Sequence, residues 1–573
     1  MKVLGINLNH ISSAALLIDG EIVSAACQER FSRKKMTREF PYQAIEYVLE
    51  ENGLTINDID AVSVPINPSI NMDFNKKSFS QIPRWFPDYL YLIPNNIFQI
   101  LKPNTHKYIK QQFVFSEKNN LDIYYINHHL SHSALAYYLS KFTNSAIFSF
   151  DGFGERTCTM WAKAEDERIS VLQEQWFPHS LGYFYEMITE FLGFQPDLDE
   201  WKVMGMAAYG DSNRYIDEMS QLIIFKQEGK YELELSFFNH YNFDVPGHFT
   251  PKLAELLGKP RFSNEELEQR HFDIAASAQV LFEKVLFRCL EYLHSVTGES
   301  NLCVTGGSAM NCLANGKIQE STPFENVFVP YAPDDSGLSF GGALYVFHEI
   351  LNNKYTVKQH RSSYLGPQYT NVAIEKELNK YGISYIVSDN LANDTVEYLT
   401  SGKVVAWFQG KMEFGQRALG NRSILADPRN GEVKEVINSK IKYRESYRPF
   451  APAVLKEKAS LYFEMKEDEE VDYMEKALRV RKEKQDKIPA AVHNDGTGRL
   501  QTVDKRDNPL FFELIKAFED KTGIPILINT SFNIQGSPIV CTPGDALKTF
   551  FTSGLDVLVI GDYIIKKGAS GNS

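Results

Sequence analysis

The sequence has little cysteine, and the cysteines it has are scattered. The six cysteines form no Cys-x-x-Cys pair, which argues against a thiolate metal site and indicates no disulfide framework. Scattered thiols of this kind are typical of a reducing compartment. We therefore expect a cytoplasmic protein whose thiols are buried.

The sequence also lacks an excess of positive charge and an unbroken apolar run. Its formal net charge is −13, so we expect no nucleic acid among its main partners. The start of the chain has no basic region, and the aromatic run at 82–101 is broken by prolines and charges, so we expect no signal peptide and no membrane span. No internal repeat or low-complexity segment is visible. The 573 residues, 43% of them hydrophobic, are enough for more than one domain.

Two histidines one helical turn apart are the first candidate functional group. The apolar spacing of residues 128–138 predicts a helix that carries His128 and His132 on one face, and a short apolar strand follows that ends at Asp151. Two imidazoles and a carboxylate suit iron(II), zinc or manganese, and Asp335 in a later turn could be a fourth ligand. The alternative is structural, because histidines can cap and pack a helix and aspartates often cap turns.

The beginning of the chain predicts a hairpin and a polar loop. Three short strands are predicted within residues 3–26, with a type I′ turn at Asp19-Gly20 and with His10 in the loop after the first strand. Actin/hexokinase-like domains place a phosphate-contacting loop in this way, although many α+β proteins begin similarly. The basic segment 29–35 could hold an anion, but its charge pattern favours a solvated surface.

Two later segments could approach a ligand or only pack tightly. Lys202 lies in the small-residue segment 199–210. The strand 302–305 is followed by Gly306-Gly307 and a helix predicted at 308–319, so that backbone N–H groups at the helix start would face a nucleotide.

Basic residues of the second half are interleaved with glycine, serine and apolar residues. Guanidinium groups bind phosphate in a bidentate manner, so this arrangement favours a polyanionic small ligand over a solvated surface. The residues concerned are Arg417, Arg422, Lys442, Arg444, Arg448 and Arg499. Asn529, Thr530 and Ser531 follow a predicted strand and could bind phosphate or form a simple turn. The mixed charges of residues 464–487 predict an exposed helix.

These motifs resemble the O-carbamoyltransferase family, which includes the tobramycin, cephamycin and novobiocin tailoring enzymes and the nodulation-factor carbamoyltransferases. The match runs nearly end to end. The motifs are HISSAALL from residue 10, ERFSRKK from 29, HHLSH from 128, DGFGE from 151, KVMGMAAYG from 202, GGSAMN from 306, EFGQRALGNRSILADPR from 413, RPFAP from 448, DGTGRLQTV from 495 and NTSFN from 529.

The resemblance implies an α/β protein of two domains. Residues 1–355 would form an actin/hexokinase-like carbamoyl-transfer domain akin to the threonylcarbamoyl-tRNA transferases. Residues 356–393 would form a linker segment, and residues 394–573 a YrdC-like domain. The implied partners are carbamoyl phosphate, ATP and a small hydroxylated acceptor from secondary metabolism, such as an antibiotic or toxin precursor, with a homodimer as a candidate assembly.

The resemblance also implies two half-reactions and a set of site residues. Carbamoyl phosphate and ATP with Mg²⁺ would form carbamoyl-adenylate in the second domain, and the first domain would transfer the carbamoyl group. Residues expected at the reacting groups are His10, Lys442, Arg444, Arg448, Arg499 and Ser531. Nucleotide contacts are expected from Lys202, Gly306, Gly307, Asn311, Arg417, Arg422, Asn529 and Thr530. His128, His132, Asp151 and Asp335 would hold a divalent transition metal, with iron(II) as first choice and manganese or zinc as alternatives.

The chain departs from the family's pattern in two places. The common motif has a carboxylate directly after the histidine at position 10, where this chain has Ile11, and Ala208 replaces a frequent proline. The loss of that carboxylate leaves the orientation of His10 open. Two other functions share parts of this pattern: a threonylcarbamoyl-adenylate or tRNA-modifying enzyme, and an actin-like ATPase or sugar kinase that uses only the first domain.

Overall fold

The computed structural model describes residues 1–67, 107–116, 119–242, 245–355, 362–445, 447–448 and 450–567. The chain forms two compact units. The first contains Met1–Ala25 and Arg38–Arg361, and the second contains Ala26–Thr37 and Ser362–Ser573. Most of the segment 67–113, to which the sequence assigns no role, lies outside the described residues.

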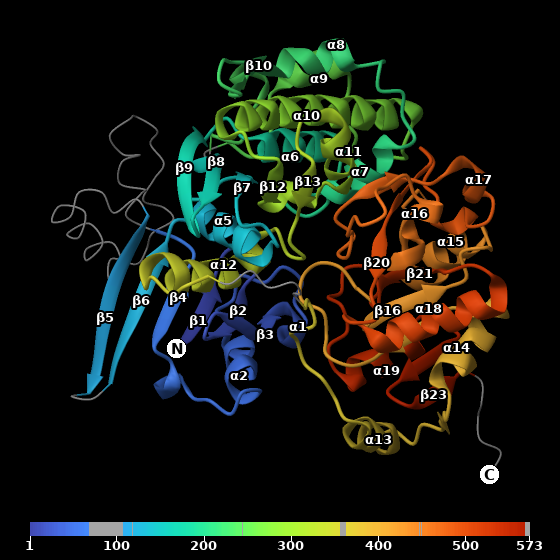
Figure 1. Ribbon diagram of the computed structural model, residues 1–573. Coiled ribbons are helices and arrows are strands. Elements are labelled where there is room, and N and C mark those ends of the chain that lie inside the picture. Colours follow the sequence, from blue (N-terminus) through green and yellow to red (C-terminus); the bar gives the residue numbers. More distant parts are fainter. Residues whose placement is uncertain are drawn as a thin grey trace. The chain divides into compact units, whose positions relative to one another are not determined.

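The first unit begins with a six-stranded sheet in the order β3-β2-β1-β4-β6-β5 (Figure 1). β1 is antiparallel to β2 and parallel to β4, and β4 is parallel to β6. Asp19 and Gly20 have φ values of 49° and 82°, as a type I′ turn requires, so the predicted hairpin is confirmed. The strands are β1 Lys2–Asn7, β2 Ser13–Ile18, β3 Glu21–Cys27, β4 Ala61–Val64, β5 Tyr108–Ser116 and β6 Asn119–Ile126.

A second sheet repeats this pattern. Its order is β13-β12-β7-β8-β9, with β7 antiparallel to β8, β7 parallel to β12, and β12 parallel to β13. These pairs match β1-β2, β1-β4 and β4-β6, so one α/β pattern occurs twice although the sequence shows no repeat. The mixed α/β class and the actin/hexokinase-like arrangement expected from the sequence are confirmed. The strands are β7 Ser145–Phe150, β8 Thr157–Glu165, β9 Arg168–Trp176, β12 Asn301–Thr305 and β13 Asn326–Phe328.

Two helices pack against each other between these sheets. α5 (His128–Leu139) lies on β7 and β12, and α12 (Leu338–Leu344) lies on β1 and β2 (Figure 1). Gly341 allows the close approach, because a Cβ atom there would lie 2.0 Å from the backbone oxygen of Ser131 in α5. Both helices are buried along their length.

The remaining elements of the first unit cover the outer faces of the sheets. α2 packs on β2, and the long α10 packs on β7, α6 and α7. Their bounds are α2 Tyr42–Glu50, α6 Leu181–Phe191, α7 Glu200–Ala207, α8 Ile216–Met219, α9 Pro251–Leu257, α10 Gln269–Thr297 and α11 Cys312–Ser321, with a small sheet of β10 Ile223–Phe225 and β11 Tyr231–Leu233. Among the described residues, no helix is long and apolar enough to cross a membrane.

The second unit is built on an eight-stranded mixed sheet in the order β14-β23-β22-β15-β16-β21-β17-β20. Its strands are β14 Ile386–Val387, β15 Val405–Phe408, β16 Arg422–Ala426, β17 Ala451–Leu455, β20 Gln501–Val503, β21 Ile526–Ser531, β22 Val557–Ile560 and β23 Tyr563–Lys566. A two-stranded sheet adds β18 Ala477–Arg479 and β19 Thr497–Arg499. The helices are α1 Glu29–Ser32, α13 Asn371–Lys380, α14 Leu391–Thr400, α15 Val433–Val436, α16 Ala459–Tyr462, α17 Lys482–Gln485, α18 Pro509–Thr522 and α19 Pro543–Thr552. Residues 362–393, expected to link the domains, thus contain α13 and β14 of this unit.

The basic segment 29–35 belongs to the second unit, and its arginines bond to backbone carbonyls there. Arg30 is 5% exposed, pairs with Glu29 at 2.7 Å and donates to the Gly415 carbonyl at 2.8 Å. Arg33 donates to the carbonyl of Ile539 at 2.7 Å. The interpretation of this segment as a solvated surface is therefore wrong for its arginines, whose guanidinium groups donate to backbone carbonyls of the second unit, whereas Lys34 and Lys35 are exposed.

Two predicted helices are also corrected. The helix predicted at 308–319 begins only at Cys312, because Asn311 leaves the helical conformation and caps α11 by accepting from the backbone N–H of Ala314. The exposed helix predicted at 464–487 is wrong. Its residues include β18, which pairs with β19, and Lys476, which is buried and bonded to Glu469 at 2.6 Å.

We expect Gly341→Ala to destabilise the first unit by about 1–3 kcal/mol, the usual cost of overpacking a full core. The added methyl group would collide with the Ser131 carbonyl and push α5 from α12. Urea unfolding followed by fluorescence measures the effect. Gly431→Ala is the control, because its nearest neighbour would lie 3.8 Å away. Equal stability of the two variants would contradict this account of the helix contact.

Candidate metal centre and anion site

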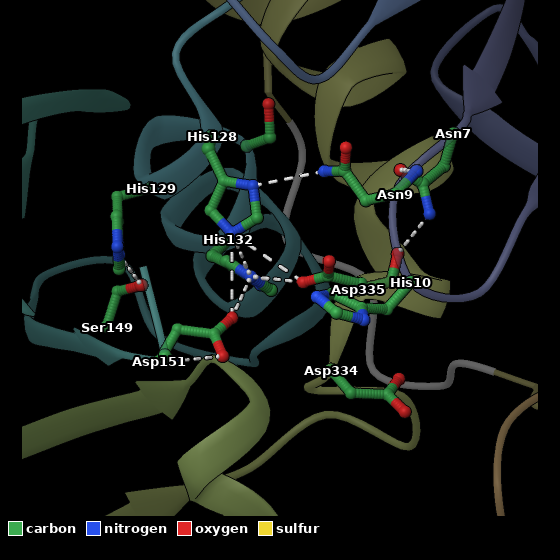
Figure 2. Close-up of polar contacts among 12 residues, drawn as sticks. Asn7, Asn9, His10, His128, His129, His132, Ser149, Asp151, Asp334 and Asp335 are labelled. Carbon is green, nitrogen blue, oxygen red and sulfur yellow. Dashed lines mark hydrogen bonds and ion pairs between the residues drawn. The ribbon is translucent and has the colours of Figure 1, made fainter. Parts of the chain in front are cut away.

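Four side chains converge where strands of both sheets end. His128 and His132 come from the first turn of α5, which follows β6. Asp151 directly follows β7, and Asp335 follows β13 at the turn that leads into α12. Figure 2 shows the two imidazoles facing the two carboxylates, and one donor atom from each residue lies within 4.8 Å of the others.

The spacing of these donor atoms fits a metal ion. Nε2 of His132 lies 3.2 Å from Nε2 of His128, 3.1 Å from Oδ2 of Asp151 and 3.5 Å from Oδ1 of Asp335. Nε2 of His128 lies 3.5 Å and 3.6 Å from the same two oxygens. Four ligands at bond lengths of about 2.1 Å around a tetrahedral centre are about 3.4 Å apart. Two nitrogens and two oxygens also suit zinc, manganese or iron(II).

The electrostatics show how strongly these groups interact. Burial would raise the pKa of Asp151, but His128 and His132 hold it well below its usual value. Burial would lower the pKa of His132, but hydrogen bonds to Asp151 and Asp335 outweigh it and raise that pKa to about 9. A cation among these groups is therefore stabilised, whether it is a proton or a metal.

The neighbouring residues fix the first turn of α5. Asn127 caps it by accepting from the Leu130 backbone N–H at 2.9 Å, as expected for this residue type. Glu155 is buried and accepts from the backbone N–H of His128 at 3.0 Å. His129 points away from the four ligands (Figure 2), with Nδ1 2.7 Å from the Ser149 hydroxyl and Nε2 2.8 Å from the Thr157 carbonyl. Because burial lowers the pKa of His129 well below its usual value, it serves as a neutral structural residue.

The loop after β1 borders this centre. Asn7 donates from Nδ2 to the backbone carbonyl of Asp335 at 2.8 Å, and Asn9 Nδ2 lies 3.2 Å from Nδ1 of His128. His10 lies beside Asp335 in Figure 2. Reasoning from the sequence missed Asn7 and Asn9, because asparagine in a loop is so common that neither gave a signal.

Four residues of the first unit were expected to contact the nucleotide, and only the two glycines among them lie at this centre. Gly306 has a φ of 95° and lies directly after β12, where a Cβ atom would collide with the end of β7. A Cβ atom on Gly307 would lie 2.8 Å from Oδ1 of Asp151. Asn311 instead exchanges hydrogen bonds with Gln279. Lys202 pairs with Asp199 at 3.0 Å.

In the second unit, Lys442 and Ser531 meet at the end of β21. Lys442 is 3% exposed, and its ammonium group donates to the Ser531 carbonyl, to the Ser531 hydroxyl at 3.2 Å and to Asn533 Oδ1 at 2.7 Å. Burial lowers the pKa of Lys442 well below its usual value, and the nearby Arg444, Arg448 and Lys35 lower it further. The hydrogen-bond acceptors are neutral oxygen atoms, and the three charged neighbours are cations. The ammonium group of Lys442 therefore lies in a positive environment.

Arg444 continues this cluster. Its Nε donates to Asn438 at 2.6 Å, and its guanidinium group lies over the Phe450 ring. Burial lowers the pKa of Arg444 well below its usual value, with Arg448 and Arg499 adding to the effect. The structure thus brings Arg499, from a distant part of the sequence, to the cations of the segment 442–448, which are Lys442, Arg444 and Arg448.

The other residues expected at this site have different surroundings. Arg422 is fully buried, stacks on Phe408 and donates to the carbonyls of Pro367 and Gly410. Asn529 is fully buried and donates to Gln501 at 2.7 Å. Arg417 and Thr530 are half-buried. We therefore leave Arg422 and Asn529 out of the ligand contacts proposed below.

Two family models match the chain. The carbamoyltransferase N-terminus matches residues 2–344, and the carbamoyltransferase C-terminus matches residues 396–567. Together with the fold and the two clusters, these matches show that the chain belongs to the carbamoyltransferase family and is a carbamoyl-transferring enzyme.

Individual relatives agree with this assignment. An uncharacterized protein of Synechocystis sp. is 36% identical over 98% of this chain and 95% of its own length. Nodulation protein NolNO of Sinorhizobium fredii is 35% identical over 97% of this chain and 79% of its own. Nodulation protein NolO of Bradyrhizobium diazoefficiens is 39% identical over 77% of this chain and 79% of its own. Among solved structures, HypF of T. kodakarensis covers 60% of this chain and 47% of its own at 12% identity and a TM-score of 0.30, a likeness too low to carry an argument.

We expect purified protein to contain about one transition metal per chain, as a single four-ligand centre implies. His132→Asn should lower the metal content, measured by inductively coupled plasma mass spectrometry, because it removes an imidazole ligand. His129→Asn is the matched control, since His129 belongs to the same helix turn and faces Ser149. Fully active protein without a transition metal, or unchanged metal content in His132→Asn, would refute the metal centre.

Proposed function

We propose that this protein is an ATP-dependent O-carbamoyltransferase that works through carbamoyl-adenylate. In the second unit, carbamoyl phosphate, ATP and water give carbamoyl-adenylate, phosphate and pyrophosphate. In the first unit, the carbamoyl group passes from the adenylate to a hydroxyl group of a small acceptor, and AMP leaves.

The observation that carries this proposal is the cluster of cations in the second unit. Lys442 is buried, Arg444, Arg448 and Arg499 are half-buried, and the pKa values of Lys442 and Arg444 are lowered. Buried like charges destabilise a fold until an opposite charge neutralises them. ATP and carbamoyl phosphate carry such charge on phosphate oxygens, which guanidinium groups bind in a bidentate manner. This chemistry supports adenylate formation in the second unit.

The transfer step is assigned to the first unit. His128, His132, Asp151 and Asp335 would hold a divalent metal, which when bound supplies a Lewis acid for a carbonyl or phosphoryl oxygen. His10, beside Asp335, accepts the proton of the acceptor hydroxyl as its oxygen attacks the carbamoyl carbon. The burial of both histidine ligands keeps water from most of this centre.

Pyrophosphate should stabilise the protein through the cation cluster. At 100 times its dissociation constant it would add about 2.7 kcal/mol. Arg499→Ala should reduce this gain and leave the ligand-free thermal midpoint equal or higher, because it relieves repulsion on Arg444. The exposed Arg479, opposite Thr497 in the neighbouring strand, provides the control Arg479→Ala. A full pyrophosphate effect in Arg499→Ala would contradict the assignment.

The two half-reactions should be separable by mutation. With carbamoyl phosphate, ATP and Mg²⁺, Arg499→Ala should abolish pyrophosphate release because it removes a phosphate ligand. Asp151→Asn should leave pyrophosphate release intact and lower AMP release. Arg479→Ala and Asp166→Asn, both at exposed positions, are the controls.

Three outcomes would contradict this proposed function or part of it. Equal loss of pyrophosphate release in Arg499→Ala and Asp151→Asn would refute the division between units. Dependence on added tRNA would favour the tRNA-modifying alternative. ATP turnover without carbamoyl phosphate would favour the ATPase or sugar kinase alternative.

A further inference from the structure

The residue directly after His10 is Ile11, which offers the imidazole no carboxylate. Ile11, which stands where the related motif has an acidic residue, is 4% exposed and lies in the apolar interior. The residues on either side of the loop are fixed as well, because Asn7 donates to the Ile11 carbonyl at 2.8 Å and Ser13 donates to Ser336. His10 therefore needs a partner from another part of the chain.

Asp197 provides that partner. Its Oδ2 lies 2.8 Å from Nδ1 of His10. Asp197 lies in the loop before α7 and has a φ of 66°, a left-handed conformation that is uncommon for residues other than glycine. Its backbone N–H donates to Oε1 of Glu200 at 2.7 Å, which holds the loop in this conformation.

Arg38 lies beside the same ring and is nearer to the same nitrogen atom. Its Nη2 lies 2.5 Å from Nδ1 and 3.4 Å from Nε2 of His10, and 3.4 Å from Oδ2 of Asp197. A neutral imidazole nitrogen either donates or accepts, so Nδ1 cannot bond to both partners at once. With Asp197 as partner, Nδ1 carries the proton and the lone pair lies on Nε2. With Arg38 as partner, Nδ1 accepts and Nε2 carries the proton.

We propose that Asp197 is the positioning residue that binds Nδ1 of His10 and so places the lone pair on Nε2, which acts as the base, while Arg38 competes for Nδ1. The proposal rests on the transfer reaction assigned above. In that step the acceptor O–H bond breaks and its proton moves to Nε2. The oxygen forms a bond to the carbamoyl carbon, the bond from this carbon to the AMP oxygen breaks, and AMP leaves with the electron pair.

The charges around His10 agree with this role. Asp197 and Arg38 face it from their loops, and Asp335 faces it from the turn before α12. Burial lowers the pKa of His10, but Asp197 outweighs this effect and the pKa is raised. The imidazolium formed after proton transfer is thus stabilised by the same carboxylate that orients the ring, as in catalytic triads.

The first test measures AMP release after adenylate formation, with two probe nucleophiles. Water, in the absence of an added acceptor, must lose a proton to a base as it attacks. Hydroxylamine attacks through its neutral nitrogen and needs no base beforehand. Asp197→Asn should slow the water reaction by about 10- to 100-fold, a part of the ~10²–10⁴-fold that general-base catalysis contributes.

The controls separate positioning from folding. Asp197→Asn should leave the hydroxylamine reaction unchanged, and Asp197→Glu should restore part of the water reaction. Asp217→Asn, at an exposed position in α8, should change neither. Equal loss with water and hydroxylamine, or no rescue by glutamate, would overturn the proposal in favour of a structural role.

The second test does not depend on turnover. Diethyl pyrocarbonate modifies neutral imidazole, so the pH dependence of His10 labelling, read by peptide mass spectrometry, reports its pKa. Asp197→Asn should move the midpoint to lower pH and Arg38→Met should move it to higher pH. An unchanged midpoint in Asp197→Asn would overturn the pairing. Absence of pyrophosphate release in the wild type would instead refute the proposed function and leave the labelling result to decide the pairing.

Discussion

The contact between α5 and α12 is the constraint on which the first unit depends. Each helix covers one of two sheets of the same topology, and Gly341 brings α12 to the backbone of Ser131, the residue before His132. The same contact sets the distance between the histidines on α5 and Asp335, which lies just before α12. Packing and chemistry thus depend on one close approach, and neither sheet alone could assemble the four donor atoms.

The two units hold opposite kinds of site. In the first unit, carboxylates and imidazoles surround a position that favours a cation. In the second unit, the buried ammonium group of Lys442 and the half-buried guanidinium groups of Arg444, Arg448 and Arg499 form the proposed anion site. Both arrangements are unfavourable for the protein alone, because burial removes charged groups from water. In the second unit the cations lie beside a large buried apolar core, which includes Phe450 and Phe532 and holds neighbouring backbone in place before a ligand binds.

All four candidate metal ligands were expected from the sequence, and His128, His132 and Asp151 each had a strong local signal. The spacing of His128 and His132 fixes them on one helix face, and Asp151 ends an apolar strand. The residues that support them gave weaker signals. Glu155 belongs to a recognisable motif, but its bond to the backbone of His128 depends on how β8 approaches α5. Asp197 gave no signal, because its role depends on the loop conformation and on a residue from the first hairpin.

The sequence by itself determined the early hairpin, the start of α5 and the α/β class, since these follow from turn chemistry, capping and apolar periodicity over a few residues. Tertiary structure decided the rest. Part of the segment 464–487 forms a strand. The helix expected from residue 308 begins only after Asn311, and Arg30 is buried in the second unit. Tertiary structure also placed Asp197 beside His10. Local backbone preferences depend on residues that are near neighbours in the chain. These outcomes depend instead on which segments, distant in the sequence, pack together and bury their apolar surfaces.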